Sequence, residues 1–69
     1  MIRTGTKVKW TWGKGTATGR VEQAYRNSVT KTIKGTQVTR HGESGNKALY
    51  IKQDDGGFVL KLESEVSRA

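Results

Sequence analysis

The alternation of apolar and polar residues is most regular near the start of the chain, in the segment Lys7–Trp12. Val8, Trp10 and Trp12 fall on one side of an extended backbone, and two lysines and a threonine fall on the other. A period of two predicts a half-buried β-strand. Gly13-Lys14-Gly15 follows directly, and its glycines predict a tight turn.

A second strand is predicted over Thr16–Tyr25, where Ala17, Gly19 and Val21 share one side. The small residues at positions 17 and 19 predict a place where the strand bends or passes close to a bulky neighbour. The alternation slips between Val21 and Ala24, which predicts a β-bulge.

Two β-branched runs, Ser28–Ile33 and Thr36–Arg40, flank Lys34-Gly35 and predict a β-hairpin with a two-residue turn. The few apolar residues of this segment are Val29, Ile33 and Val38. With so little apolar surface to bury, the hairpin is expected to project into solvent and to be the most mobile regular element.

The rest of the chain alternates between polar loops and apolar strands. We expect a loop over 41–46, strands over Ala48–Gln53 and Phe58–Leu62, and a turn over Asp54–Gly57 between the two strands. In that turn, aspartate side chains bond nearby backbone amides and a glycine takes a positive φ. Glu63–Val66 predicts a 3₁₀ turn that places its valine on the end of the fold.

Five or six short strands joined by short turns predict an all-β fold, a small antiparallel barrel that forms one domain over residues 1–69. A chain of 69 residues buries only about 60% of its unfolded surface, so its core is thin. The absence of cysteine excludes a disulfide and a Cys-based zinc site. No apolar stretch approaches the length of a signal-peptide core or a membrane span, so we expect a monomer in the cytoplasm.

The charge of the chain is divided unevenly along its length. Through Gly42 there are nine bases and one acid, whereas from Glu43 onward there are four bases and five acids. The first part therefore carries a net charge of +8 and the second part −1, which gives the total of +7. A one-sided positive field attracts polyanions, of which nucleic acid is the commonest large example in a cell.

Two segments together resemble a known family. The first contains the pattern W-x-W-G-x-G-x-A-x-G-x-V, from Trp10 to Val21, and the second contains Q-D-D-G at 53–56 and L-K-L-x-S-E at 60–65. This combination resembles the Tudor-like domain family of hypervirulence-associated proteins, over nearly the whole chain. The resemblance implies an SH3-like barrel of the Tudor type. It implies little about mechanism, because the family's biochemical role is largely undefined and SH3-like barrels carry many functions.

Catalytic chemistry has little basis in this sequence. The single histidine, His41, lies in a glycine-flanked loop, and nearby Ser44 has no third group to orient the pair. Asp54-Asp55 is more typical of a turn than of a cation site, and Gly13-Lys14-Gly15 lacks the spacing and the helix of a phosphate loop. We therefore expect no enzymatic activity, no cofactor and no bound metal.

The five aromatic residues raise the hypothesis of a cage for methylated side chains, for which Tudor barrels are known. A thin core, however, needs most of its large residues for packing. The alternation predicts Trp10 and Phe58 in the core and Trp12 near the barrel mouth, and leaves Tyr25 and Tyr50 open between core and surface. A net charge of +7 also repels the basic tails that usually carry methyl-lysine.

The sequence therefore predicts a non-catalytic module that binds DNA or RNA weakly through phosphate contacts in its N-terminal two-thirds. The predicted phosphate contacts are Lys7, Lys9, Lys14, Arg20, Lys31, Lys34 and Arg40. The predicted aromatic contacts are Trp12, Tyr25 and Tyr50, the first two by base stacking.

Three alternatives stay open. In the first, the basic residues only solvate a small protein. In the second, the module is an adaptor that binds a peptide in a groove between the Trp12 turn and the Asp54–Gly57 turn. In the third, the chain is a subunit that acts only inside an assembly.

Overall fold

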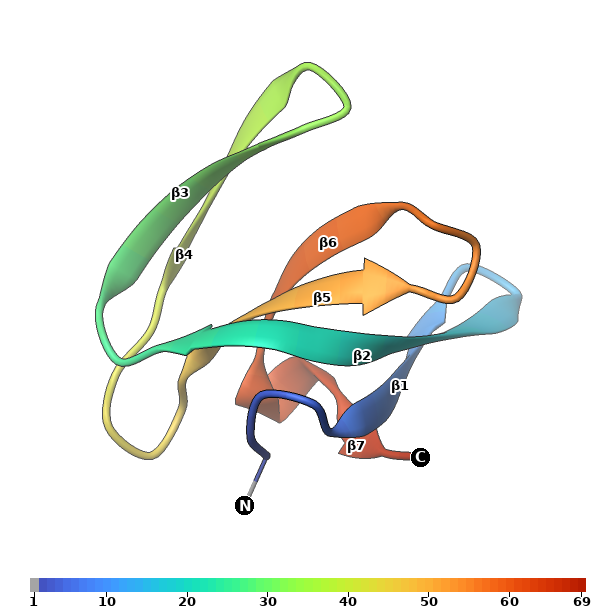
Figure 1. Ribbon diagram of the computed structural model, residues 1–69, viewed down its shortest axis with the longest axis horizontal. Coiled ribbons are helices and arrows are strands. Elements are labelled where there is room, and N and C mark those ends of the chain that lie inside the picture. The colour runs from blue at the N-terminus through green and yellow to red at the C-terminus, as the bar shows by residue number, and fades with distance from the viewer. Residues whose placement is uncertain (1) are drawn as a thin grey trace.

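The computed structural model describes residues 2–69 as an all-β fold with one short 3₁₀ turn. Figure 1 shows the strands curling into a small barrel, with a separate hairpin above it. The elements are β1 (Lys7–Trp12), β2 (Gly15–Tyr25), β3 (Ser28–Ile33), β4 (Thr36–His41), β5 (Ala48–Gln53), β6 (Phe58–Leu62), η1 (Glu63–Glu65) and β7 (Ser67–Arg68). The predicted all-β class is confirmed and all six predicted strands are present, while β7 was not predicted.

Five strands form one antiparallel sheet in the order β6-β5-β2-β1-β7. β7 brings the end of the chain back to β1, where Ser67 pairs with Lys9 and Arg68 pairs with Val8. This order, with a 3₁₀ turn before the last strand, is that of an SH3-like barrel. The β3–β4 hairpin is a second, two-stranded sheet inserted between β2 and β5.

The main core lies on one face of the five-stranded sheet, which we call the inner face. Its buried residues are Ile2, Val8, Trp10, Val21, Leu49 and Ile51. Cross-strand partners share a face, and the pairing of Val21 with Ile51 places both on this side. Val66 packs against the same core directly after η1, as the sequence predicts.

Gly19 lets β5 pass close to β2. A Cβ at position 19 would stand 2.6 Å from the Lys52 carbonyl oxygen and 2.7 Å from Ile51 Cγ2. Both separations are well inside van der Waals contact, so any side chain would push the two strands apart. The predicted close approach is therefore present, and the neighbour is β5.

The predicted bulge in β2 is also present, and it changes which side chains face outward. The pairing with β5 shifts between Val21 and Gln23. After the shift, Ala24 packs against the core and Tyr25 points to the opposite face. Without the bulge, the period of two would have placed Tyr25 on the same side as Val21.

Phe58 does not lie in the main core, so the prediction for this residue is wrong. It pairs with Lys52 on the outer face of the sheet, the face opposite the main core, whereas the neighbouring Val59 packs inward. Leu60 also belongs to the outer face, yet it is only 2% exposed. The alternation correctly predicts that Phe58, Leu60 and Leu62 share a face. That face is the outer face of the sheet, which is also covered, and not the face of the main core.

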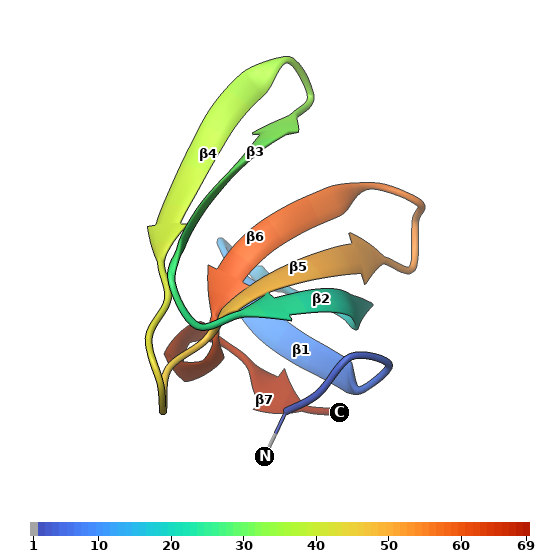
Figure 2. The same ribbon diagram turned by 60° about the vertical axis from the view of Figure 1, so that its left-hand side comes forward.

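The cover of that outer face is the β3–β4 hairpin, which contacts β6 through both of its strands. Figure 2 shows the hairpin arching over β6. Alternate residues of β3 and β4 are half-buried, so one face of the hairpin points at the barrel. The expectation that it projects freely into solvent is therefore wrong. Its predicted turn is confirmed, since Lys34 and Gly35 both have positive φ, as primed two-residue turns require.

Candidate functional site

Three bases from three neighbouring strands form a row across the outer face. Lys7 of β1 pairs with Arg20 of β2, and Arg20 pairs in turn with Lys52 of β5. Adjacent strands lie about 4.8 Å apart, so the three side chains leave the sheet side by side. We call Lys7, Arg20 and Lys52 the basic row. Two of the three belong to the predicted set of phosphate contacts, and Lys52 does not.

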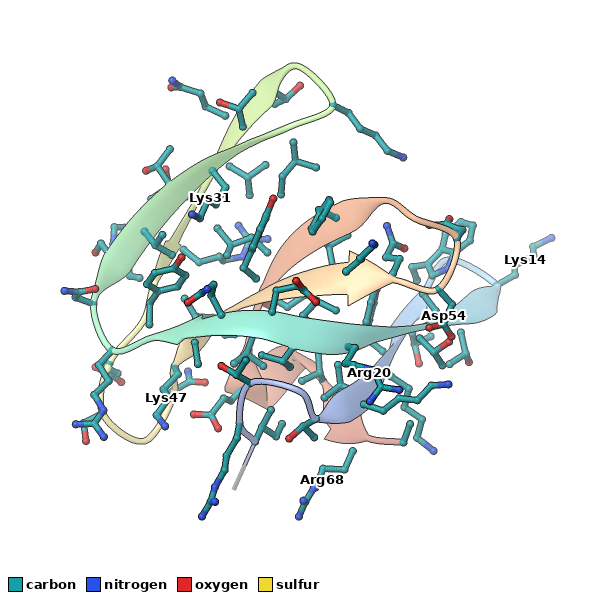
Figure 3. The ribbon with its side chains drawn as sticks, viewed as in Figure 1. Lys14, Arg20, Lys31, Lys47, Asp54 and Arg68 are labelled. Atoms are coloured by element: carbon teal, nitrogen blue, oxygen red, sulfur yellow. The ribbon has the colours of Figure 1, made fainter. Side chains whose placement is uncertain are left out.

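Lys9 and Lys14 extend the positive charge beyond the row. Lys9 is the next exposed outward residue of β1 after Lys7. Lys14 lies in the turn between β1 and β2, where Figure 3 shows its side chain reaching away from the barrel. Of the predicted phosphate contacts, Lys7, Lys9, Lys14 and Arg20 thus belong to the β1–β2 part of the barrel.

Asp54 is the acidic residue at the edge of this region. Its Oδ2 accepts a hydrogen bond from Thr18 Oγ1 and lies 3.6 Å from Lys7 Nζ. The Thr18 hydrogen bond and the charges of Lys7 and Arg20 hold the pKa of Asp54 below its ordinary value of 3.8, against a smaller opposing effect of desolvation. Asp54 therefore stays ionised and offsets part of the charge of Lys7.

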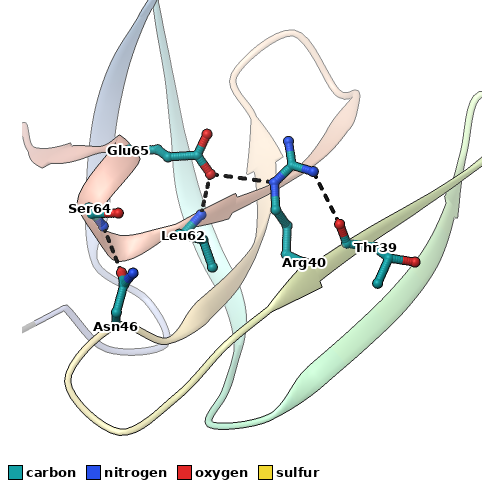
Figure 4. A network of polar contacts seen from close by, with 6 residues as sticks. All are labelled: Thr39, Arg40, Asn46, Leu62, Ser64 and Glu65. Carbon is teal, nitrogen blue, oxygen red and sulfur yellow. Dashed lines mark hydrogen bonds and ion pairs between the residues drawn. The ribbon is translucent and has the colours of Figure 1, made fainter.

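The remaining predicted phosphate contacts lie on the hairpin, and each contacts a different part of the barrel. Arg40 Nε lies 3.4 Å from Glu65 Oε1, which also accepts a hydrogen bond from the Leu62 amide (Figure 4). Lys34 Cε lies 3.9 Å from the position that a Cβ on Gly57 would take, so the Lys34 side chain reaches from the hairpin tip toward the β5–β6 turn.

Lys31 occupies an aromatic cluster that we define as Tyr25, Tyr50 and Phe58. Its Nζ lies 5.3 Å from the centroid of the Tyr25 ring and 5.0 Å from that of the Tyr50 ring. Tyr50 and Phe58 are stacked, with centroids 4.9 Å apart and an interplanar angle of 11°. In Figure 3, Lys31 lies between its own strand and the barrel rather than on the free side of the hairpin.

Trp12 is the exposed large apolar residue of the described chain, with 63% of its surface accessible. It borders a groove of about 600 Å³, to which both turns of the predicted peptide site contribute. The groove also contains Trp10, Lys34, Asp54, Asp55 and Lys61. Its walls thus combine an indole with charges of both signs.

The single histidine pairs with a serine other than Ser44. His41 is the last residue of β4 rather than part of a loop, and its Nδ1 lies 2.7 Å from Ser28 Oγ of the paired strand. This pair is exposed. Asp55 accepts a hydrogen bond from the Gly57 amide and Gly56 has a positive φ, which confirms the predicted turn. Within residues 2–69, no group of three potential metal ligands comes together.

Together, the small all-β barrel, its exposed indole and its basic row define the class of a small Tudor-like binding module, and Tudor-like domains are in general non-catalytic. Residues 5–66 match the family model described as the TUDOR domain of hypervirulence associated proteins, and the chain belongs to this family. No curated protein and no solved structure matches the chain. None of the described residues forms a helix long and apolar enough to cross a membrane.

Two features of the site escape sequence reasoning. Lys52 joins the basic row only through the register of β2 with β5, which depends on where the bulge falls. Phe58 joins the aromatic cluster because the hairpin covers the outer face of β6. Tyr50 and Lys52 are two residues apart in β5 and therefore point to the same face. This spacing is the one feature of the sequence that indicates an aromatic ring beside a residue of the basic row.

Proposed function

We propose that this protein binds nucleic acid through the phosphate backbone, on the outer face of its five-stranded sheet. The observation that carries this proposal is the basic row, in which Arg20 lies between Lys7 and Lys52 on adjacent strands. Lys9 and Lys14 continue the same charge toward the β1–β2 turn. Only one acid, Asp54, forms an ion pair with this group among the described residues.

Such a surface recognises phosphates without reading bases. Lysine and arginine side chains on a sheet face neutralise phosphate charge and release counterions, so the affinity falls steeply with salt. Binding in the range typical of non-specific complexes, with Kd on the order of 10⁻⁴–10⁻⁶ M, is expected at physiological salt. The proposal assigns the direct contacts to the barrel because the basic row presents three cations on one open face, whereas the charged groups of Lys31 and Arg40 turn toward the barrel.

The test is fluorescence anisotropy of a short labelled DNA with the wild type and two double variants of equal charge. Arg20→Glu/Lys52→Glu reverses two charges within the basic row, and Arg26→Glu/Lys47→Glu reverses two charges outside it. Figure 3 shows Lys47 away from Arg20, near the Tyr25 end of β2. At about 50 mM salt, we expect the row variant to lose at least about tenfold in affinity and the control to lose clearly less.

Equal losses in the two variants would show that only net charge matters and would remove the basic row as the site. Wild-type protein that binds no DNA at about 50 mM salt would overturn the proposal itself. Circular dichroism of both variants provides the check on folding, since all four substituted side chains lie outside the main core.

A second candidate function is the binding of a peptide in the Trp12 groove. The observation that favours it is the largely exposed indole beside a groove of about 600 Å³, within the size range of ligand sites. Aromatic residues of this kind are common anchors in protein–protein recognition. A peptide partner would contact Trp12 together with the aspartates of the β5–β6 turn.

The salt dependence separates the two candidates. A peptide complex held by Trp12 is expected to survive about 200 mM salt and to be lost in Trp12→Ala. Phosphate binding by the basic row is expected to be lost at that salt concentration and to be retained in Trp12→Ala. A pull-down that is unchanged in Trp12→Ala would count against the groove.

A further inference from the structure

The aromatic cluster lies directly beside the basic row. Tyr50 and Lys52 are alternate residues of β5 and so point to the same face, and Phe58 pairs with Lys52 from β6. Lys52 in turn neighbours Arg20. Rings and cations thus form one continuous surface, in which a strand of nucleic acid bound by its phosphates would carry its bases across the rings.

The hairpin covers the rings of this surface and leaves the basic row open. Lys31 Nζ lies within 6 Å of the centroids of both tyrosine rings, a geometry typical of cation–π attraction. Tyr50 already stacks on Phe58 in a nearly parallel arrangement, so the cluster accepts flat partners. A base and the Lys31 ammonium would therefore compete for the same rings.

The hairpin is attached to the barrel through its side chains. Among the described residues, no backbone hydrogen bond joins Ser28–His41 to the five-stranded sheet. The contacts that hold it include the half-buried apolar side chains Val29, Ile33 and Val38, the Lys31 ring contact and the ion pair of Arg40 with Glu65. Lifting the hairpin breaks no strand pairing of the barrel.

We infer that Tyr25, Tyr50 and Phe58 form a base-stacking platform for single-stranded nucleic acid, and that Lys31 occupies it in the free protein. This inference rests on the proposed binding of nucleic acid and adds its substrate class and its regulation. Single strands displace Lys31 and stack their exposed bases on the rings. Duplexes, whose bases are already stacked, bind only the basic row and leave the hairpin in place.

The decisive variant is Lys31→Met, which keeps a long unbranched side chain and removes the charge. If Lys31 competes with bases, the variant binds a labelled single strand about three- to tenfold more tightly than the wild type, although it has lost a positive charge. Binding of the corresponding duplex is unchanged or weaker. Lys47→Met is the matched control, and we expect it to weaken both ligands slightly.

The opposite sign overturns the inference. If Lys31→Met weakens single strand and duplex alike, then Lys31 is a phosphate contact and the rings are not a platform. This result leaves the basic row intact as a site, so it is distinguishable from failure of the proposed function. Wild-type protein that binds neither ligand at about 50 mM salt overturns the function and the inference together.

A measurement on the wild type tests the same point without a substitution. Ring-proton NMR signals of Tyr25 and Tyr50 are expected to shift upfield on addition of a single strand and to stay in place on addition of a duplex. Ring signals that do not move while the amides around Arg20 do would contradict the inference.

Discussion

The barrel and the hairpin of this protein are held together by different forces. The buried residues of the five-stranded sheet are apolar, and Val8, Leu49 and Ile51 have no measurable exposure. The hairpin instead meets the barrel through half-buried side chains, with Lys31 on two tyrosines and Arg40 on Glu65. The barrel has a fully buried apolar core, whereas the hairpin is attached through half-buried side chains, some of them apolar (Val29, Ile33 and Val38) and some cationic.

The difference suggests a division of roles within 69 residues, in which the barrel core sets the stability of the fold and the hairpin contacts bear on the proposed binding. Full burial of a Leu or Ile side chain contributes about 1.5–3 kcal/mol. An exposed ion pair contributes only about 0–1 kcal/mol, and an exposed cation–π contact about 0.5–1 kcal/mol. The half-buried contacts of the hairpin are therefore individually weaker than those of the core, and loss of a core residue affects the whole fold.

The largest expected effect distinguishes the two regions directly. Ile51→Ala removes a fully buried side chain and is expected to lower the free energy of unfolding by about 2–5 kcal/mol. Val29→Ala, on the half-buried face of β3, is expected to cost less than about 1.5 kcal/mol. Urea unfolding followed by tryptophan fluorescence measures both. Similar losses in the two variants would show that the hairpin is part of one cooperative core.

An intermediate effect tests how tightly the barrel itself is packed. Gly19→Ala places a Cβ against the Lys52 carbonyl oxygen and is expected to cost about 1–3 kcal/mol. Gly15→Ala is the control in the same strand, because the nearest atom to its Cβ would be Trp12 Cε2 at 4.0 Å. Thermal unfolding that gives equal midpoints for the two variants would mean that β2 and β5 separate without cost.

The elements of the fold were predictable because each has a local signature. Strict alternation marks β1, paired β-branched runs mark β3 and β4, and the Lys34-Gly35 dipeptide marks the turn between them. β7 has no such signature, since two residues carry no period and the strand exists only because it pairs with β1. Short strands of this kind depend on the completed sheet.

The site was less predictable, because it depends on register and on tertiary cover. The bulge in β2 sends Tyr25 to the outer face and aligns Arg20 with Lys52. A one-residue change in the position of the bulge would have reversed which side chains share a face. The inserted hairpin covers the outer face of β6, so this strand has apolar side chains packed on both faces. Alternation alone could not show that Phe58 belongs to the outer face rather than to the main core.

The smallest expected effect compares an ion pair of the barrel with one of the hairpin. Both pairs, Lys7–Asp54 and Arg40–Glu65, are substantially exposed, and Thr18 and Lys7 lower the pKa of Asp54. Because its pKa is lowered from 3.8 in the folded protein, Asp54 adds stability that is present above that value and is lost as the pH falls through the lowered pKa.

The hydrogen bond from Thr18 is the largest cause of this shift, ahead of the charge of Lys7. Thr18→Val is therefore expected to remove more of the stability loss below about pH 4 than Lys7→Met does. Arg40→Met, in the hairpin, is expected to leave that part of the profile unchanged. Unfolding midpoints measured across this range check the order of the three variants. A profile that Arg40→Met alters more than Thr18→Val would place the acid-sensitive contact in the hairpin, and would mean that the hairpin leaves the barrel when its carboxylate partner is protonated.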